Sequence, residues 1–289
     1  MKNQSITEAM LQFIEESPTA FHAAANVEAL LLENGFEKLE NLAEGALVPG
    51  GSYYTMQNGS AVLAVKIPEN PAKGFRIAAS HSDSPCFKIK EVPEMKVENT
   101  YVKLNVEKYG GMILSPWLDR PLSVAGRVFV AGKDGKPEAK LVNLKKDLLI
   151  IPNVAIHFNR EINNGFAYNP QTDMAPLMGL DQELSIKKLC AEAADVAEEE
   201  ILGSDLYVYN RDKGRFMGAD DSLIGAPRLD DLQCAYATLR GFLASKPEEF
   251  ISVYALFDNE EVGSGTKQGA DSTFLEEFLE IVLENVYPD

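Results

Sequence analysis

The sequence predicts an α/β fold that is interrupted by a β-rich segment. Helical and strand-like periods alternate near both ends of the chain, as in sheets covered by helices. Two short apolar runs, 75–81 and 250–257, are typical of strands buried on both faces. Short alternating segments fill the middle instead. We therefore expect an α/β domain in two parts, 1–91 and 218–289, around a β-rich insertion at 92–217.

The first part begins with two predicted helices and a hairpin. "SITEAMLQFIEESP" has Ser5 as a helix cap and apolar residues at helical spacing, and a second helix starts near Thr19 and is stopped by Gly35. In "SYYTMQNGSAVLAVKIP", two strand-like runs flank Asn58-Gly59, which predicts a tight hairpin. The run "FRIAASH" then predicts a strand that ends in polar residues, where α/β proteins place their chemistry.

The middle and last parts differ in pattern. The middle contains the strand-like segments "TYVKLNVEKYG", "GRVFVAG" and "DLYVYNRDKGRFMG", the turn "KDGKPE" and one acidic helical stretch, "AEAADVAEEEILG". After it, "DDLQCAYATLRGFLAS" predicts a helix, "FISVYALF" a buried strand and "STFLEEFLEIVLENV" a helix.

Composition excludes several classes of partner. The 289 residues carry 27 Lys and Arg against 44 Asp and Glu, a formal charge of −17, which argues against nucleic acid as a partner. Cys86, Cys190 and Cys234 show no CxxC spacing, which favours a reducing cytoplasm over a disulfide framework. No signal-like segment and no apolar run of about 20 residues is present. We expect a soluble cytoplasmic protein without a membrane partner.

His81 and Asp83 lie two residues apart at the end of the predicted strand 75–81. In extended geometry both side chains point the same way, so Asp83 can hold one ring nitrogen while the other binds a metal. Taken alone, His-x-Asp is more often a polar strand-to-loop turn with a surface histidine.

Asp230 and Asp231 stand at the start of a predicted helix. Acidic side chains at that position commonly cap the helix, which is the ordinary interpretation of this pair. The functional alternative is that one aspartate faces a cleft and ligates metal, bridging two cations through its two oxygens.

Glu260 and Glu261 follow the buried run 250–257. Successive side chains diverge at a strand exit, so one carboxylate can bind a cation while its neighbour exchanges a proton with a water beside it. Gly263 and Gly265 would let the backbone turn tightly, although any strand-to-helix loop uses glycines in this way. Together with His81 and Asp230, these residues offer the nitrogen and oxygen ligands that suit zinc.

The chain resembles the M18 family of zinc aminopeptidases, the aspartyl aminopeptidase group. The resemblance rests on motifs in family order: "SPTAFHAAAN", "YYTMQNGS", "AASHSDSPCFKIK", "PWLDRPLSVAGRV", "IPNVAIHFNR", "APRLDDL" and "FDNEEVGSGT". It implies a zinc-peptidase-type α/β catalytic domain, whose β-rich insertion at 92–217 is the dimerisation domain, and a site with two zinc ions. It also implies peptide substrates and a homo-oligomer, a dimer that can assemble into a dodecamer.

The resemblance also implies a role for each site residue. His81 would ligate one metal, Asp230 would bridge both, and Glu261 would ligate a metal. Glu260 would be the general base and acid, Asp83 would orient His81, and the Asp230-Asp231 bond would be cis.

Two further histidines lie outside this group. His157 matches a histidine that enters a neighbouring subunit's active site and helps hold the substrate or oxyanion; read without the family, it is more often buried or at a strand edge. We expect His22 to be structural.

One departure from the family bears on activity. The family's site has two further ligands, an Asp and a His, and no histidine lies beyond position 157 of this sequence. We therefore expect this chain to lack the C-terminal part of the catalytic domain and to bind zinc weakly. The alternative is a non-catalytic assembly or regulatory subunit that retains the dimerisation domain.

Overall fold

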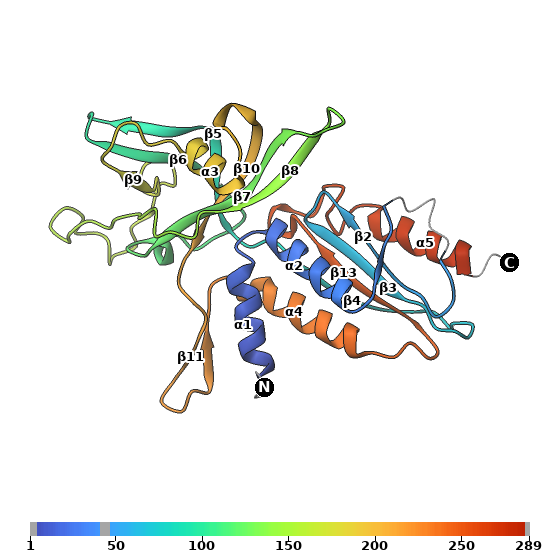
Figure 1. The fold of residues 1–289 in the computed structure, drawn as a ribbon. Coiled ribbons are helices and arrows are strands. Elements are labelled where there is room, and N and C mark those ends of the chain that lie inside the picture. Colours follow the sequence, from blue (N-terminus) through green and yellow to red (C-terminus); the bar gives the residue numbers. More distant parts are fainter. Residues whose placement is uncertain (1–4, 41–46, 287–289) are drawn as a thin grey trace. The chain divides into compact units, whose positions relative to one another are not determined.

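The computed structural model describes residues 5–40 and 47–286, and the chain divides into two compact units (Figure 1). Unit 1 comprises Met1–Ser84 and Lys213–Asp289, and unit 2 comprises Pro85–Asp212. Of the boundaries expected from sequence, 91/92 falls inside strand β5 (Cys86–Val97) and 217/218 falls at the end of strand β11 (Arg215–Met217). No helix in the described part of the chain is both long and apolar enough to cross a membrane.

Unit 1 contains a five-stranded sheet of order β1-β2-β3-β13-β4. Its strands are β1 (Glu37–Lys38), β2 (Ser52–Gln57), β3 (Ala61–Lys66), β4 (Phe75–His81) and β13 (Ile251–Phe257). The predicted hairpin is confirmed, since β2 and β3 pair antiparallel and both Asn58 and Gly59 have the positive φ of such turns. Strand β13 runs antiparallel to β3 and parallel to β4, so β13 and β4 end at the same edge.

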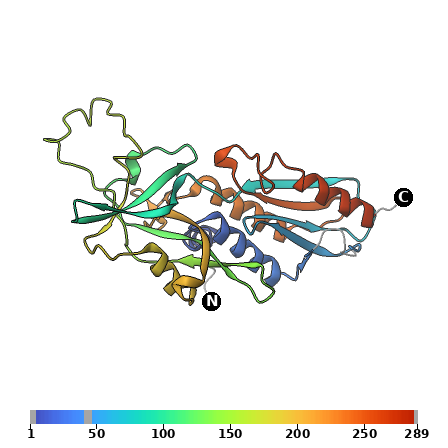
Figure 2. The same ribbon diagram turned by 90° about the horizontal axis from the view of Figure 1, so that it is seen from above.

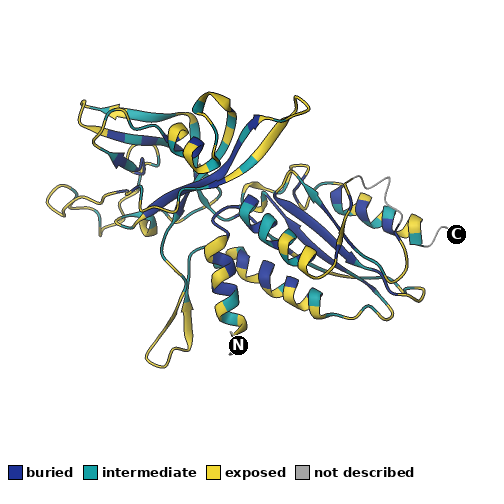
Figure 3. Cartoon of the chain, in the orientation of Figure 1, coloured by how far each residue is buried: buried dark blue, intermediate teal, exposed yellow. Residues whose placement is uncertain are grey.

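Helices cover both faces of this sheet (Figures 1 and 2). One layer contains α1 (Ile6–Glu16), α2 (Ala20–Glu33) and α4 (Leu229–Ala244), and the other contains α5 (Phe274–Val286). Because strand side chains alternate, Tyr254 and Leu256 of β13 pack with the first layer, whereas Val253 and Ala255 pack with α5. Figure 3 shows the inner strands β3 and β13 as the buried centre of this unit. The predicted α/β class is confirmed.

The helix signals in the sequence correspond to real contacts. Ser5 accepts a hydrogen bond from the Glu8 amide while the Glu8 carboxylate accepts one from the Ser5 amide, a complete capping box. Gly35, with φ of 80°, follows the end of α2 as expected. A separate two-stranded hairpin, β11 with β12 (Leu223–Gly225), precedes α4.

The expectation that strand 75–81 is buried on both faces is wrong. β4 is the last strand of the sheet order and pairs with β13 on one side. Ile77 consequently remains 45% exposed although it lies in an apolar run. The sequence shows that the run is apolar, but its position in the sheet depends on the order in which distant strands pair. Strand β13, which lies between two neighbours, is buried as predicted.

Unit 2 contains an antiparallel six-stranded sheet of order β8-β7-β10-β5-β6-β9. Its remaining elements are β6 (Tyr101–Tyr109), η1 (Ser115–Trp117), β7 (Leu122–Ala131), β8 (Pro137–Asn143), β9 (Leu177–Gly179), α3 (Ile186–Ala194), η2 (Glu198–Glu200) and β10 (Ile201–Asn210). Helix α3 packs on the sheet through Ile186 and Cys190.

The acidic stretch 191–203 was expected to be helical, and it is helical only in part, since 191–194 belong to α3 and Glu198–Glu200 form the 3₁₀ turn η2. Helix α3 ends at Ala194, Asp195 takes a left-handed conformation with φ of 54°, and β10 begins at Ile201. The pairing of β10 with β7 along its length outweighs the local helix preference of this stretch.

Candidate functional site

The candidate site lies where β4 and β13 end in unit 1. Phe257 pairs with His81 at the last position of the two parallel strands, which brings the following residues together. The buried Ser82 fixes this edge, because its amide and its hydroxyl both donate to the Phe257 carbonyl oxygen, at 2.8 and 3.0 Å. Its hydroxyl also lies 2.9 Å from the Ser60 carbonyl oxygen in the β2–β3 turn.

His81 is the centre of the cluster. Its Nδ1 lies 3.2 Å from Asp83 Oδ1, as predicted from the His-x-Asp spacing. Its Nε2 lies 3.3 Å from Asp230 Oδ1 and 3.9 Å from both Asp231 Oδ2 and Glu260 Oε2. Burial lowers the pKa of His81, but the hydrogen bond to Asp83 and the charges of Asp83, Asp231 and Glu260 outweigh burial and raise that pKa to about 9.

Asp83 connects the two strand ends. Its side chain is 3% exposed. Besides contacting His81, its carboxylate accepts hydrogen bonds from the backbone amides of Glu260 at 3.3 Å and Glu261 at 3.2 Å. Asp83 therefore sets the position of the Glu-Glu segment relative to the imidazole, a contact that the sequence spacing did not reveal.

Asp230 and Asp231 occupy the start of α4, and the peptide bond between them is cis, as predicted. No side-chain cap is formed at the start of α4, and both aspartates have non-helical backbone angles, so the capping interpretation does not describe them. The Ser84 hydroxyl donates to the Asp230 carbonyl oxygen at 2.8 Å. The Asp230 side chain is 83% exposed and points its Oδ1 toward His81.

Asp231 was given no role from the sequence. Its Oδ2 accepts a hydrogen bond from the His81 backbone amide at 3.2 Å, so it joins the helix start to the end of β4. The pair of aspartates in the sequence indicated a site, but the spacing did not show which aspartate contacts the His81 ring and which binds the His81 backbone amide.

Glu260 and Glu261 form the 3₁₀ turn η3 (Glu260–Val262) directly after β13. The Glu260 carboxylate, rather than that of Glu261, comes within 4 Å of His81 Nε2. Burial raises the pKa of Glu261, and the charges of Asp83, Glu260 and Asp230 raise it further, while His81 opposes this rise. Positive φ angles occur at Asn259, Gly263 and Ser264, so the tight turn uses Ser264 where Gly265 was expected.

The other two histidines are His22, in unit 1, and His157, in unit 2. His22, in α2, has its Nδ1 2.8 Å from the Thr19 hydroxyl, consistent with the structural role expected for it. His157 belongs to unit 2 and is exposed in a turn between β8 and β9, not buried or at a strand edge.

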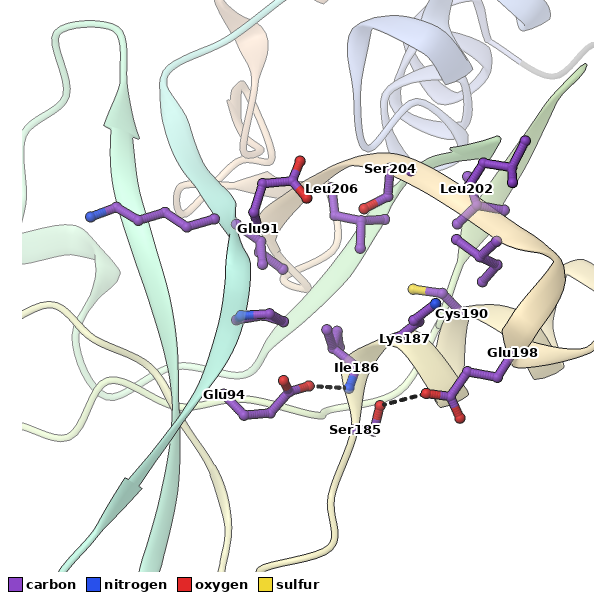
Figure 4. Close-up of a pocket in the computed structure, with 16 residues that line it drawn as sticks. Glu91, Glu94, Ser185, Ile186, Lys187, Cys190, Glu198, Leu202, Ser204 and Leu206 are labelled. Carbon is purple, nitrogen blue, oxygen red and sulfur yellow. Dashed lines mark hydrogen bonds between the residues drawn. The ribbon is translucent and has the colours of Figure 1, made fainter. Parts of the chain in front are cut away.

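A cavity of about 340 Å³ lies in unit 2 between β5, β10 and the start of α3 (Figure 4). Its lining includes Glu94, which accepts a hydrogen bond from the Ile186 amide at 2.7 Å, and the buried Cys190. None of the predicted site residues lines it. Across residues 5–40 and 47–286, no group of three or more His, Cys, Asp and Glu side chains is arranged to hold a metal ion.

The sheet of unit 1 and the cluster around His81 define an α/β protein with its polar side chains gathered at strand ends. The chain belongs to the M18 peptidase family, since the family model described as Aminopeptidase I zinc metalloprotease matches residues 13–286. This is a family of zinc-dependent aminopeptidases, and the resemblance found in the motifs is confirmed.

Individual relatives agree with this assignment. The probable M18 family aminopeptidase 2 of Clostridium acetobutylicum is 44% identical over 292 residues, covering 98% of this chain and 67% of that protein. A chain in the cryo-EM structure of the Ape4 and Nbr1 complex is 31% identical with a TM-score of 0.92, covering 98% of this chain and 60% of that one. Chaetomium thermophilum mApe1 is 30% identical with a TM-score of 0.89, covering 97% and 68%. This chain thus spans roughly two thirds of the length of its relatives.

Proposed function

We propose that the protein is a metalloaminopeptidase that hydrolyses N-terminal residues from peptides at the strand ends of unit 1. The observation that carries the proposal is the approach of His81 Nε2 to Asp230 Oδ1, at 3.3 Å, beside the Glu260 carboxylate. Membership of a zinc aminopeptidase family supports the same reaction.

Two of the proposed donors are spaced as zinc ligands are. Two ligands bonded to zinc at about 2.0–2.2 Å in tetrahedral geometry lie roughly 3.3–3.6 Å apart, which matches the separation between His81 Nε2 and Asp230 Oδ1. We propose that His81 holds one ion, that Asp230 bridges two, and that Glu261 is a further ligand. Bound zinc would polarise the scissile carbonyl and make a water more acidic.

The protein's own residues would position the reactants and move the proton. Asp83 accepts the Nδ1 hydrogen of His81, which leaves the Nε2 lone pair available as a ligand. The raised pKa of His81 means that this imidazole must lose a proton before it can ligate, so binding of the metal is coupled to proton release. Glu260 would accept a proton from the attacking water and return it to the leaving amine.

We also propose a homo-oligomer in which unit 2 is the dimerisation domain. The turn that carries His157 is flanked by exposed apolar side chains, with Val154 58% and Phe158 85% exposed. Apolar side chains gathered in this way favour burial against another subunit. There His157 would help to hold substrate in the neighbouring subunit's site. Sedimentation at increasing concentration should show dimers or a larger assembly, and Phe158→Ser should shift the protein toward monomer.

The same apolar turn favours the second candidate, a non-catalytic assembly or regulatory subunit. This alternative keeps the interface of unit 2 and requires no hydrolysis. It is distinguished by activity, because an assembly subunit would oligomerise through residues such as Phe158 while Glu260→Ala changed nothing measurable.

Three free cysteines, Cys86, Cys190 and Cys234, support the proposal of a reducing, cytoplasmic location. Fluorescence microscopy of a tagged protein in its own cell would test this location directly.

Zinc content and hydrolysis of aminoacyl chromogenic substrates test the enzymatic proposal. We expect zinc-dependent hydrolysis by wild type once zinc is added in excess of its weak binding, and Glu260→Ala should lower kcat by about 10²–10⁴-fold because the proton acceptor is lost. Asp221→Asn, an exposed acidic residue, is the matched control and should leave kcat unchanged. Absence of zinc-dependent hydrolysis, or equal rates in wild type and Glu260→Ala, would refute the proposal.

A further inference from the structure

The segment after β13 is closed into a loop by the side chain of Asn259. The Asn259 Oδ1 accepts hydrogen bonds from the Thr266 hydroxyl at 2.7 Å and from Gln268 Nε2 at 2.8 Å. The backbone closes the same loop, because the Asp258 amide donates to the Gln268 carbonyl oxygen at 3.0 Å. Gln268 is buried, so its bond to Asn259 is partly shielded from solvent, whereas the bond from Thr266 is exposed. We call residues 258–268 the Glu-Glu loop.

The backbone of Asn259 also has a specific conformation and specific hydrogen bonds. Its φ of 61° lies in the left-handed region, which asparagine and glycine adopt more readily than other residues. Its carbonyl oxygen accepts hydrogen bonds from the amides of Val262 at 3.2 Å and Ser264 at 2.8 Å. Asn259 therefore fixes both the start of η3 and the return of the chain toward Gln268.

Close packing holds the far end of the loop. A Cβ placed on Gly269 would lie 2.1 Å from the Ser264 carbonyl oxygen, so the two backbone segments touch directly. This close approach leaves no room for a side chain where the chain leaves the Glu-Glu loop.

Glu260 and Glu261 are thus held from two sides. Asp83 receives their backbone amides on one side, and Asn259 with its partners sets the direction of the chain on the other. The Asp83 bonds, at 3.3 and 3.2 Å, fix where the amides lie but leave the rotation of the segment to the loop.

We propose that Asn259 is a positioning residue for the Glu260-Glu261 pair, acting through the hydrogen bonds that its Oδ1 accepts from Thr266 and Gln268. The effect on zinc binding and catalysis rests on the proposed function, whereas the effect on the position of the two glutamates does not. It predicts that removing the amide oxygen, with the left-handed backbone retained, displaces both glutamates.

The test compares Asn259→Gly with Asn259→Asp. Glycine keeps the left-handed backbone and removes the acceptor, whereas aspartate tolerates the same φ and keeps an oxygen for both donors. Asn58→Gly is the matched control, because Asn58 has a φ of 54° in the β2–β3 turn and lies outside the Glu-Glu loop.

Hydrogen–deuterium exchange of peptides that contain Glu260 and Glu261 is the first readout. We expect Asn259→Gly to increase exchange of these peptides by about tenfold or more, with Asn259→Asp and Asn58→Gly close to wild type. Unchanged exchange in Asn259→Gly would overturn the proposal. If Asn259→Gly fails to fold, Thr266→Val removes one donor at constant shape and must itself speed exchange, or the proposal fails.

Zinc affinity and kinetics form the second readout. Loss of a positioning contact typically costs about 10- to 100-fold in metal affinity or activity, so Asn259→Gly should lower zinc affinity and kcat to this extent with little change in KM. Recovery in Asn259→Asp would separate positioning from loss of folding. If wild type neither binds zinc nor hydrolyses peptides, the proposed function fails, while the exchange comparison still decides the role of Asn259.

Discussion

Replacing Asp83 with asparagine tests the connection between the two strand ends. The Asp83 carboxylate accepts hydrogen bonds from the Glu260 amide and the Glu261 amide and contacts His81 Nδ1. In Asp83→Asn, one of the two oxygens becomes an NH₂ group. In either orientation of the new amide, its NH₂ group faces at least one N–H group that donated to the Asp83 carboxylate, so two donors meet inside a buried site.

The expected loss of stability follows from that mismatch. A hydrogen bond to a buried charged group contributes about 1.5–3 kcal/mol, and one such bond is lost. The free energy of unfolding, measured by urea titration at pH 7, should fall by about that amount. Asp221→Asn, an exposed aspartate, is the control and should change the free energy by less than about 0.5 kcal/mol.

The same variant should change the titration of His81. Without the hydrogen bond and charge of Asp83, the pKa of His81 falls from about 9 toward or below its usual 6.5, because burial then dominates. In wild type, the pKa of His81 is higher in the folded state than in the unfolded state, so protonated His81 stabilises the fold fully below about pH 6.5. This stabilisation is lost as the pH rises through 9. The stability difference between wild type and variant should therefore be larger at pH 6 than at pH 9.5.

Nuclear magnetic resonance of the three histidines gives the pKa directly. An unchanged midpoint in urea together with a His81 pKa still near 9 would refute the role assigned to Asp83.

Three further predictions concern other parts of the chain. Burial raises the pKa of Cys190 to about 12, so the stability that this thiol contributes is complete below its unfolded pKa of about 9 and declines above it. Wild type should therefore lose roughly 2 kcal/mol more than Cys190→Ala between pH 9 and 11, and parallel pH curves would contradict this. Gly269→Ala should destabilise the protein by about 1–3 kcal/mol because the new Cβ would meet the Ser264 backbone. Gly241→Ala in α4 has open space around the new Cβ and should stabilise the protein by about 0.4–1 kcal/mol. Equal effects of the two substitutions in a thermal melt would show that the close approach at Gly269 is unimportant. Calorimetric titration of zinc into this chain should show weak binding. If His81, Asp230 and Glu261 are shared between two ions, each ion has about two protein ligands, whereas zinc sites usually have three or four. Two tight sites would contradict the ligand assignment.

Local signals predicted local structure well. The Ser5 capping box, the Asn58-Gly59 hairpin and the buried strand β13 all depend on residues close together in the chain, and the structure contains each of them. Expectations failed where distant partners decide the outcome. Strand β4 is exposed because of its place in the sheet order, and the acidic stretch after Ala194 turns into β10 because β7 pairs with it.

The candidate site likewise combines features that local motifs predicted with contacts that they did not. His81, Asp83, Asp230 and Glu260 could be named from motifs, and the structure brings them into contact. The Asp83 bonds could not be predicted because backbone amides carry no sequence signature, and the bonds from Thr266 and Gln268 to Asn259 could not be predicted because they depend on how the loop folds back. A single Asn between a strand and a Glu-Glu pair is the one sequence signal for this turn, because asparagine side chains commonly hydrogen-bond nearby backbone and tolerate a positive φ.

The hydrogen bond between Asp83 and Glu260 spans 177 residues of sequence, and unit 2 lies within that span. At about 5–20 residues per second of synthesis, the two halves of the site leave the ribosome roughly 9–35 s apart. Throughout that interval β4 exists without β13, its partner strand in the sheet. For that interval the nascent chain carries an unpaired apolar strand edge, and such an edge can pair wrongly.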